Sequence, residues 1–436
     1  MVSFWLHAGV LALLMFAASA PSPLYPLYAA QWRLTSATIT EVFALYALTL
    51  LAALLVAGRL SDHVGRRPVI VAALAVEAAA MVCFLGARSA ALLYLARFLQ
   101  GLATGAAIGA LSAALVELSA GRPTTVAPLV NSAAPTAGLA VGALGASALV
   151  QFGPSPSHLV YWILLACCVV AAAAVAALPE PGVRRAGALA SLVPRIGIPP
   201  RARATFTGAL PCLVALWGLG GFYLSLGPSL AGQLTGSADL LWGGLVIFLL
   251  TGVGAAASIA GRNYPPRPAM LQGCAALVAG VALTFAAITS GSAALLLAGT
   301  CVAGAGFGLA FLGAFRAIMS LAEPAERAGL VASVYVVSYL AFGVPAVAAG
   351  LAATHIGLHR TALVYAASVG VLAAAGAASL LIRRPVPDAA ATSAPHTAFP
   401  TAGGVRDLPP CPGTVPLCLH ASAITATTPA MEATTP

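Results

Sequence analysis

The sequence predicts an all-α membrane protein with twelve transmembrane helices arranged as two six-helix bundles. Hydrophobic residues make up 61% of the 436 positions and charged residues only 7%, which is too little charge to cover the surface of a soluble protein. Polar and turn residues also cut the chain into apolar segments of about 20 residues, the length that crosses a bilayer. Finally, the two halves of the chain repeat several features at corresponding positions.

The first half of the chain, residues 1–178, contains six apolar segments and is the predicted N-terminal bundle. The first segment resembles a signal peptide, but no basic residues precede it and its apolar run continues to Tyr28. It is therefore interpreted as the first membrane helix. The predicted helices are 7–29, 38–58, 68–87, 90–117, 125–150 and 158–178.

The second half begins after a polar, arginine-bearing stretch at 179–204, which is the predicted central linker on the cytoplasmic side. Residues 205–384 form the predicted C-terminal bundle, with helices at 205–232, 239–261, 268–288, 293–320, 328–354 and 360–382. The remainder, 385–436, is rich in Pro, Ala and Thr without periodicity and is predicted to be a disordered cytoplasmic tail.

Arginine placement predicts the orientation, because basic residues concentrate in cytoplasmic loops. With the N-terminus inside, the outside loops keep only Arg33, Arg88 and Arg360. The sequence therefore predicts a multi-pass protein of the inner (plasma) membrane with both termini cytoplasmic. The net charge of +9 is spread over short loops and forms no patch for nucleic acid. The predicted cytoplasmic arginines are Arg59, Arg66, Arg67, Arg122, Arg184, Arg185, Arg195, Arg201, Arg203, Arg262, Arg267, Arg327, Arg383, Arg384 and Arg406.

The polar segment between the second and third helices carries a spaced set of residues: Gly58, Leu60, Asp62, Gly65, Arg66 and Arg67. It resembles the G-x-L-x-D-x-x-G-R-R signature of the major facilitator superfamily of secondary transporters. The internal repeat is consistent with this resemblance, since Gly58-Arg59 corresponds to Gly261-Arg262 and Pro135 to Pro345. The resemblance implies two six-helix bundles that expose a central substrate site alternately to either side of the membrane.

By resemblance, Asp62 faces the positive N-terminus of the eleventh helix, which begins near Ala328. Arg66 or Arg67 is then predicted to pair with Glu326, closing the cytoplasmic side as a gate. The alternative is that Asp62 only caps backbone amides. A second capping signal lies at Thr38-x-x-Glu41, which predicts a capping box at the start of the second helix.

Two charged residues lie inside predicted membrane helices, where charge is costly and usually functional. Arg97, with Gln100 and Gly101, resembles the R-x-x-x-G motif of the superfamily, which implies a cavity-facing arginine that couples proton or substrate binding to bundle movement. The alternative is an arginine that reaches the outer surface. Glu77 is a candidate proton carrier, and its alternative is a protonated carboxyl hydrogen-bonded within its own half.

Aromatic residues beside proline-rich or glycine-rich breaks mark candidate cavity positions in the first and seventh helices. Tyr25 and Tyr28 lie in a segment that resembles the P-x-x-P pattern of drug:proton antiporters, and they offer hydroxyls to a ligand or form an interfacial belt. Trp217 and Tyr223 flank Gly220-Gly221 and precede Pro228, and a bend is predicted at this glycine pair and at Pro228. In the fifth helix, Pro135, Gly138 and Gly142 match the antiporter motif only in part and predict close helix packing.

The sequence therefore predicts a monomeric secondary transporter that exports small amphiphilic, drug-like compounds in exchange for protons, in the manner of a multidrug resistance pump. A proton-coupled importer of an organic acid is the first alternative, and a non-transporting membrane receptor is the second. No nucleotide loop or metal-ligand pattern is recognised, since Gly357 interrupts the His355/His359 pair. No enzyme activity and no cofactor beyond a proton gradient are expected.

Overall fold

The computed structural model describes residues 2–123, 126–182, 186–194, 196–237, 239–323 and 326–382, and within these ranges the chain forms helices and no strand. The predicted tail at 385–436 lies outside the described residues. So do six of the arginines in the predicted cytoplasmic segments: Arg184, Arg185, Arg195, Arg383, Arg384 and Arg406.

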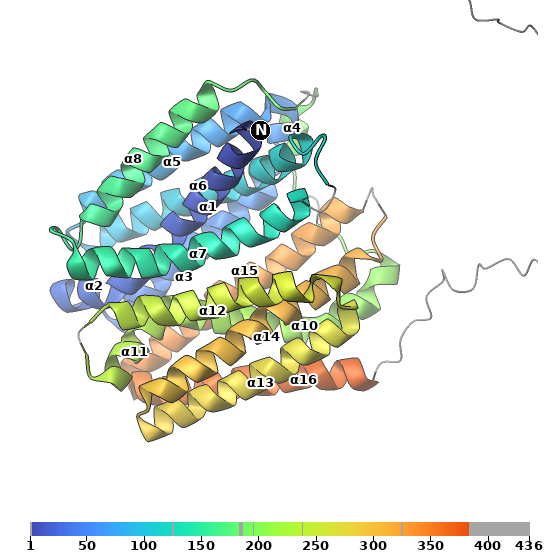
Figure 1. The fold of residues 1–436 in the computed structure, drawn as a ribbon. Helices are drawn as coiled ribbons and strands as arrows, with labels where there is room; N and C mark the ends of the chain where they lie inside the picture. The colour runs from blue at the N-terminus through green and yellow to red at the C-terminus, as the bar shows by residue number, and fades with distance from the viewer. Residues whose placement is uncertain are drawn as a thin grey trace, which may run out of the picture. The chain divides into compact units, whose positions relative to one another are not determined.

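The first half of the chain folds into helices that follow the predicted order (Figure 1). The first predicted helix is in fact three consecutive helices, and a short helix lies within the polar segment after Gly58. The elements are α1 (Val2–Ser19), η1 (Ser22–Leu24), α2 (Tyr25–Trp32), α3 (Ser36–Ala57), α4 (Ser61–Val64), α5 (Arg66–Leu85), α6 (Ala90–Glu117), α7 (Val126–Phe152) and α8 (Leu159–Ala176).

The second half repeats this plan after a linker that contains one short helix. The seventh predicted helix is split in two. The elements are α9 (Ala188–Ser191), α10 (Pro200–Ser225), α11 (Gly227–Thr235), α12 (Leu241–Ala260), η2 (Gly261–Asn263), α13 (Pro266–Ser290), α14 (Ala293–Met319), α15 (Arg327–Ile356) and α16 (Leu358–Ile382).

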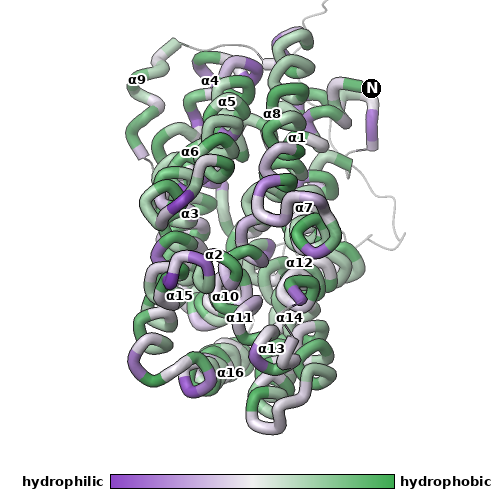
Figure 2. Tube along the Cα trace, turned by 90° about the vertical axis from the view of Figure 1, so that its left-hand side faces the viewer, coloured by the Kyte–Doolittle hydropathy of each residue, from purple (hydrophilic) through white to green (hydrophobic). Residues whose placement is uncertain are grey.

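Twelve helical spans in the described chain are long and apolar enough to cross a membrane, which confirms the predicted fold class. The backbone trace is hydrophobic along most of the helical length (Figure 2). Because a bilayer offers no hydrogen-bond partners, helices that satisfy their own backbone are the expected solution for such a sequence.

Two details at helix ends differ from the predictions. The first span begins at Val2 and not near residue 7, and it extends to Trp32. The capping box predicted at Thr38 and Glu41 is wrong, because Thr35 is the N-cap of α3 and its hydroxyl accepts from the backbone N–H of Thr38 at 3.1 Å. Glu41 lies one turn further on and accepts a hydrogen bond from Tyr94 Oη at 2.6 Å.

The bend of the seventh span lies at one of the two predicted places. The helix breaks at Leu226, directly before the Gly227-Pro228 start of α11, because proline has no N–H for the preceding turn. At Gly221 α10 continues unbroken, and the glycine serves packing instead. A methyl group there would lie 2.0 Å from the carbonyl oxygen of Phe342 on α15.

Glycines also set the distance between α1 and α7 within the first half. A methyl group at Gly138 would lie 2.4 Å from the carbonyl oxygen of Ala12, and one at Gly142 would lie 2.5 Å from that of Phe16. Pro135 lies inside α7, one turn before Gly138. Small residues at these positions let the two helix backbones touch, as is typical of membrane bundles.

The two halves meet along two seams, α3 with α15 and α7 with α12, and Figure 1 shows the second pair side by side. We call the end of the helices near Asp62 the hinge end and the opposite end the far end. A methyl group at Gly350 would lie 1.8 Å from Thr40 Oγ1 near the far end, whereas one at Gly343, two turns closer to the hinge end, would lie 3.6 Å from Ala44 Cβ.

The second seam has the same gradient. A methyl group at Gly244, near the far end, would lie 2.1 Å from Ser147 Oγ. At Gly252, nearer the hinge end, the nearest atom is Ala140 Cβ at 3.6 Å. In both seams the halves therefore approach most closely at the far end.

This geometry predicts that Gly350→Ala disfavours closure of the far end by about 1–3 kcal/mol, because the added methyl overlaps Thr40 and the carbonyl of Ser36. Spin labels at Arg88 and Arg360, one in each half at the far end, would report a longer distance by pulsed EPR. Gly343→Ala on the same helix is the matched control and should leave the distance unchanged. Equal distances in Gly350→Ala and the wild type would contradict the tight seam.

Candidate functional site

Arg97 on α6 is fully buried, with an exposed fraction of 0%, and it is the centre of a polar network in the first half. Its Nε donates to Tyr25 Oη at 2.8 Å, and its Nη2 donates to the same oxygen. Its Nη1 donates to the carbonyl of Ala18 at 2.8 Å and to Gln100 Oε1 at 2.6 Å. Arg97 therefore does not reach the outer surface, and four of the five guanidinium N–H groups have acceptors.

The prolines of the first span create part of this network. Pro21 has no N–H, so the carbonyl of Ala17 lacks the donor that a continuous helix would supply four residues on. Gln100 Nε2 donates to that carbonyl at 2.9 Å. The break in the first span and the polar face of α6 are thus complementary, since a backbone acceptor in an apolar interior must find a donor.

Glu77 on α5 joins the network through Gln100. Its Oε1 accepts from Gln100 Nε2 at 3.0 Å, and the side chain is fully buried. Its Oε2 has no hydrogen-bond partner among the described residues. A buried carboxylate needs a proton or a nearby cation, and Gln100 connects this one to the Arg97 guanidinium.

The aromatic ring of Tyr46 connects the network to the second half. The guanidinium carbon of Arg97 lies 5.3 Å from the ring centre of Tyr46 and 5.4 Å from that of Tyr25, a cation–π geometry. Ala18, Tyr46 and Leu50 form a small buried cluster, and Tyr339 of α15 packs against it. The site therefore spans the boundary between the two halves.

On the other side of this boundary lies a group of rings around Trp217 of α10, which we call the aromatic cluster. The indole ring lies 5.5–6.0 Å, centre to centre, from four rings on α14 and α15: those of Phe307, Phe311, Tyr339 and Phe342. Trp217 is half-buried, and its Nε1 has no hydrogen-bond partner within the described part of the chain. The cluster thus surrounds a buried indole N–H that has no acceptor among the described residues.

The other two candidate tyrosines have structural partners. Tyr28 Oη lies 2.9 Å from Tyr161 Oη of α8, and its ring stacks on Trp32. Tyr223 Oη lies 3.1 Å from Thr284 Oγ1 and accepts from Thr300 Oγ1 at 3.2 Å. Both side chains are buried, with their hydroxyl groups held by these partners, whereas Tyr25 is a direct partner of Arg97.

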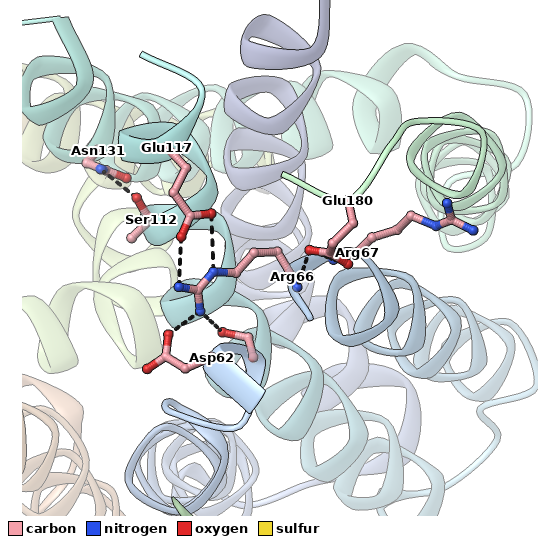
Figure 3. A network of polar contacts seen from close by, with 8 residues as sticks. Asp62, Arg66, Arg67, Ser112, Glu117, Asn131 and Glu180 are labelled. Atoms are coloured by element: carbon pink, nitrogen blue, oxygen red, sulfur yellow. Dashed lines mark hydrogen bonds and ion pairs between the residues drawn. The ribbon is translucent and has the colours of Figure 1, made fainter. Parts of the chain in front are cut away.

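A second polar network lies at the hinge end (Figure 3). The Arg66 guanidinium donates to Asp62, to Ser61 Oγ at 2.7 Å and to Glu117 Oε1 of α6 at 3.0 Å. Gly65 sits between α4 and α5 with φ of 112°, a backbone region that favours glycine. Arg66 therefore clamps α4 onto the end of α6.

Glu180 of the linker binds the start of α5. Its Oε1 accepts from the backbone N–H of Arg66 at 2.7 Å and its Oε2 from that of Arg67 at 3.2 Å. The first N–H groups of a helix have no internal partner and carry partial positive charge, so a carboxylate is favourable there. The Arg67 side chain donates to the carbonyl of Leu178, at 3.0 Å.

The predicted ion pair between Arg66 or Arg67 and Glu326 is wrong in this structure. Glu326 and Glu323, which precede α15, both pair with Arg201 of α10. The linker also docks there, since Gly197 N–H donates to the carbonyl of Gly329 at 3.4 Å. Arg201 takes the place of Arg66 or Arg67 as the partner of Glu326, because the linker positions the start of α10 beside the start of α15.

The Arg201 guanidinium lowers the pKa of the Glu323 carboxyl by hydrogen bonding and charge attraction. Because the pKa is lower in the folded state, the ion pair stabilises the protein at neutral pH. That contribution is lost as the pH falls through the lowered pKa. The pair is exposed to solvent, so its contribution is small.

Several contributors to the two networks were not assigned a functional role from the sequence. Tyr46 carries no motif signal, because an aromatic residue in an apolar helix is typical of any membrane span. Glu117 and Glu180 are charged residues near helix ends, where charge is expected without function. Within the described residues, no group of three or more His, Cys, Asp or Glu side chains is placed to hold a metal ion.

Comparison with known proteins identifies relatives by sequence family and by fold. A family model described as Major Facilitator Superfamily matches residues 8–336. No curated protein matches the sequence.

Among solved structures, the nucleoside transporter NupG is 15% identical, with 87% of this chain and 100% of that chain covered at a TM-score of 0.66. A bacterial homolog of the human lysosomal transporter Spinster, in an inward-facing and occupied conformation, is 15% identical over 86% of this chain and 96% of that one, with a TM-score of 0.68. The human organic anion transporter MFSD10 (TETRAN) is 18% identical over 86% and 98%, with a TM-score of 0.60. At such identities the likeness shows the shared fold.

The hinge network predicts different effects for two adjacent arginines. Arg66→Gln removes contacts to Asp62, Ser61 and Glu117 and should lower the free energy of unfolding by about 1–3 kcal/mol, because two carboxylates lose a charged donor. Arg67→Gln removes a contact to a carbonyl and should cost about 0.5 kcal/mol or less. Thermal unfolding of the detergent-purified variants measures both. Equal losses would refute the assignment of the clamp to Arg66.

Proposed function

The chain belongs to the Major Facilitator Superfamily, and on this premise we propose that it exports small amphiphilic compounds by alternating access in exchange for protons. Membership already makes it a multi-pass membrane transporter and not an enzyme. The observation that carries the finer proposal is the fully buried Glu77–Gln100–Arg97 network, which meets an aromatic cluster at the boundary between the two halves.

The network supports proton coupling through its net charge. With Glu77 ionised, its charge offsets that of Arg97, and with Glu77 protonated the site carries one uncompensated positive charge. In a medium of low dielectric constant that difference is large. A cationic substrate is therefore disfavoured when the proton is bound, which is the thermodynamic basis of exchange between the two.

The aromatic cluster supports an aromatic or cationic amphiphile as the substrate. Ring faces attract cations and stack on other rings, and the buried indole N–H of Trp217, which has no acceptor among the described residues, would gain one from a ligand that enters the cluster. Tyr339 of this cluster also packs against the group that contains Tyr46, so a ligand held at the cluster would lie near the Arg97 network. Substrate and proton would then interact through their charges.

Import of an organic acid with a proton is the second candidate, because a protonated Glu77 leaves the Arg97 charge free to attract an anion. The geometry favours it less. The guanidinium is fully buried and four of its N–H groups are already engaged, so an anion would have to displace Tyr25 or Gln100.

We also propose that the hinge end faces the cytoplasm, since Arg59, Arg66 and Arg67 gather there. Both termini and the linker would then be cytoplasmic, in a plasma membrane. The close approach of the halves at the far end supports a conformation that is closed toward the outside.

The proposal predicts the response of a pH gradient across proteoliposomes. In the wild type, an added hydrophobic organic cation should dissipate the gradient, because each substrate molecule exchanges for a proton. Glu77→Gln keeps an acceptor for Gln100 but removes the proton site, so dissipation should fall by about tenfold or more. The measurement is the rate of change of a pH-sensitive dye trapped in the vesicles.

Glu41→Gln is the matched control, because Glu41 is an exposed carboxylate in the neighbouring span that is bound to Tyr94 and not to Arg97, Gln100 or Glu77. It should leave the rate unchanged. Unaltered coupling in Glu77→Gln would refute the role of Glu77. If an organic acid moves together with protons while cations have no effect, the proposal of export is refuted and the proposal of an importer takes its place.

A further inference from the structure

The linker carries a strip of exposed apolar side chains that no other part of the described chain covers. Leu189 is 84% exposed, the highest value among the large hydrophobic side chains of the described residues, Val193 is 64% exposed and Ile196 is 55% exposed. We call these three residues the linker strip. Leu189 lies in α9, and Val193 follows two residues after that helix ends.

The segment is anchored on its opposite side. Ser191 is buried, and the carbonyl of Ala186 lies 2.9 Å from His63 Nδ1 of α4. Figure 2 shows α9 beside α4 at the edge of the first half. The orientation of the linker strip away from the protein is thus fixed by contacts.

The linker strip lies next to the ends of membrane spans. α4, on which α9 packs, connects α3 and α5, which are both long and apolar enough to cross the bilayer. A side chain at this level meets the headgroup region of one leaflet and not bulk water. Apolar side chains in that region bury their surface among the upper acyl groups, at about 25 cal/mol for each Å² removed from water.

The linker sequence itself carries basic charge without acidic charge. Between Glu180 and Asp239 the sequence contains no acidic residue, but it contains five arginines, at positions 184, 185, 195, 201 and 203. Arg201 is paired with Glu323 and Glu326, whereas Arg203 is exposed and donates to the carbonyl of Ile198. Arginine next to exposed apolar residues is the pattern that binds anionic phospholipids, at about 1 kcal/mol per basic residue near the surface.

A groove continues from the end of the linker strip. It has a volume of about 440 Å³ and is lined by Ile196, Ile198 and Phe206, with Arg203 among its lining residues. Its walls are mainly apolar, and its one charged lining residue is basic. Such a lining fits the glycerol and upper acyl region of a lipid whose phosphate lies near the arginine.

We propose that the linker strip and this groove form a docking site for anionic phospholipid in the leaflet at the hinge end. The occupant is the bilayer itself, through phosphatidylglycerol-type headgroups at Arg203 and acyl chains against Leu189, Val193 and Ile196. The site holds the linker on the membrane surface while its two ends hold α5 and α15. It does not depend on the identity of the transported substrate.

Hydrogen–deuterium exchange of the full chain tests the site. In nanodiscs that contain phosphatidylglycerol, amides of residues 188–199 should exchange about tenfold more slowly than in phosphatidylcholine nanodiscs or in detergent. Leu189→Glu should abolish this protection, because it places a charge in the apolar contact. Ala190→Glu, which adds the same charge one position away from the strip face, should retain most of it.

Each result decides the proposal. Equal exchange in both nanodiscs and in detergent would overturn it, and protection in phosphatidylcholine equal to that in phosphatidylglycerol would overturn the role of the anionic headgroup. Equal loss in Leu189→Glu and Ala190→Glu would show that charge alone, and not the linker strip, controls the segment. Loss confined to Leu189→Glu in phosphatidylglycerol supports the site.

Discussion

The structure of the first half depends on one physical constraint, which is the need to satisfy a permanently charged guanidinium inside an apolar bundle. Arg97 meets it with a tyrosine hydroxyl, an amide oxygen and a backbone carbonyl. Those acceptors belong to three different stretches of chain, so α6 and the broken first span must keep their relative positions. Pro21, which interrupts the first span, belongs to the same network, because it leaves the carbonyl of Ala17 free to accept from Gln100.

Small residues meet a second requirement, because helices in a bilayer must pack against one another without a hydrophobic driving force. In a bilayer, lipid is as apolar as leucine, so helices associate through close packing and polar contacts. Gly101 on α6 illustrates this, since a methyl group there would lie 1.9 Å from Thr49 Oγ1 of α3. The helix that carries the charge is therefore pressed against its neighbour about one turn beyond Arg97.

The sequence predicted the fold well and the partners of individual charges less well. Twelve spans follow from composition and segment length, and the signature between Gly58 and Arg67 identifies the family, because both are local features. The predicted partner of Glu326 was wrong, since that pairing depends on where the linker brings Arg201. The Gln100 bridge to Glu77 joins two helices whose rotation about their axes no single sequence reveals. The role of Glu180 in the linker was not predicted either, because charged residues are common near helix ends.

The gradient of contact along the two seams has a mechanical consequence. The halves are in closest contact at the far end, so we expect them to rotate relative to each other about that end. The 30-residue α15 is about 45 Å long, and a rotation of about ten degrees about one end moves the other by about 8 Å. A modest tilt therefore opens the hinge end by several ångströms, while the far end stays almost in place.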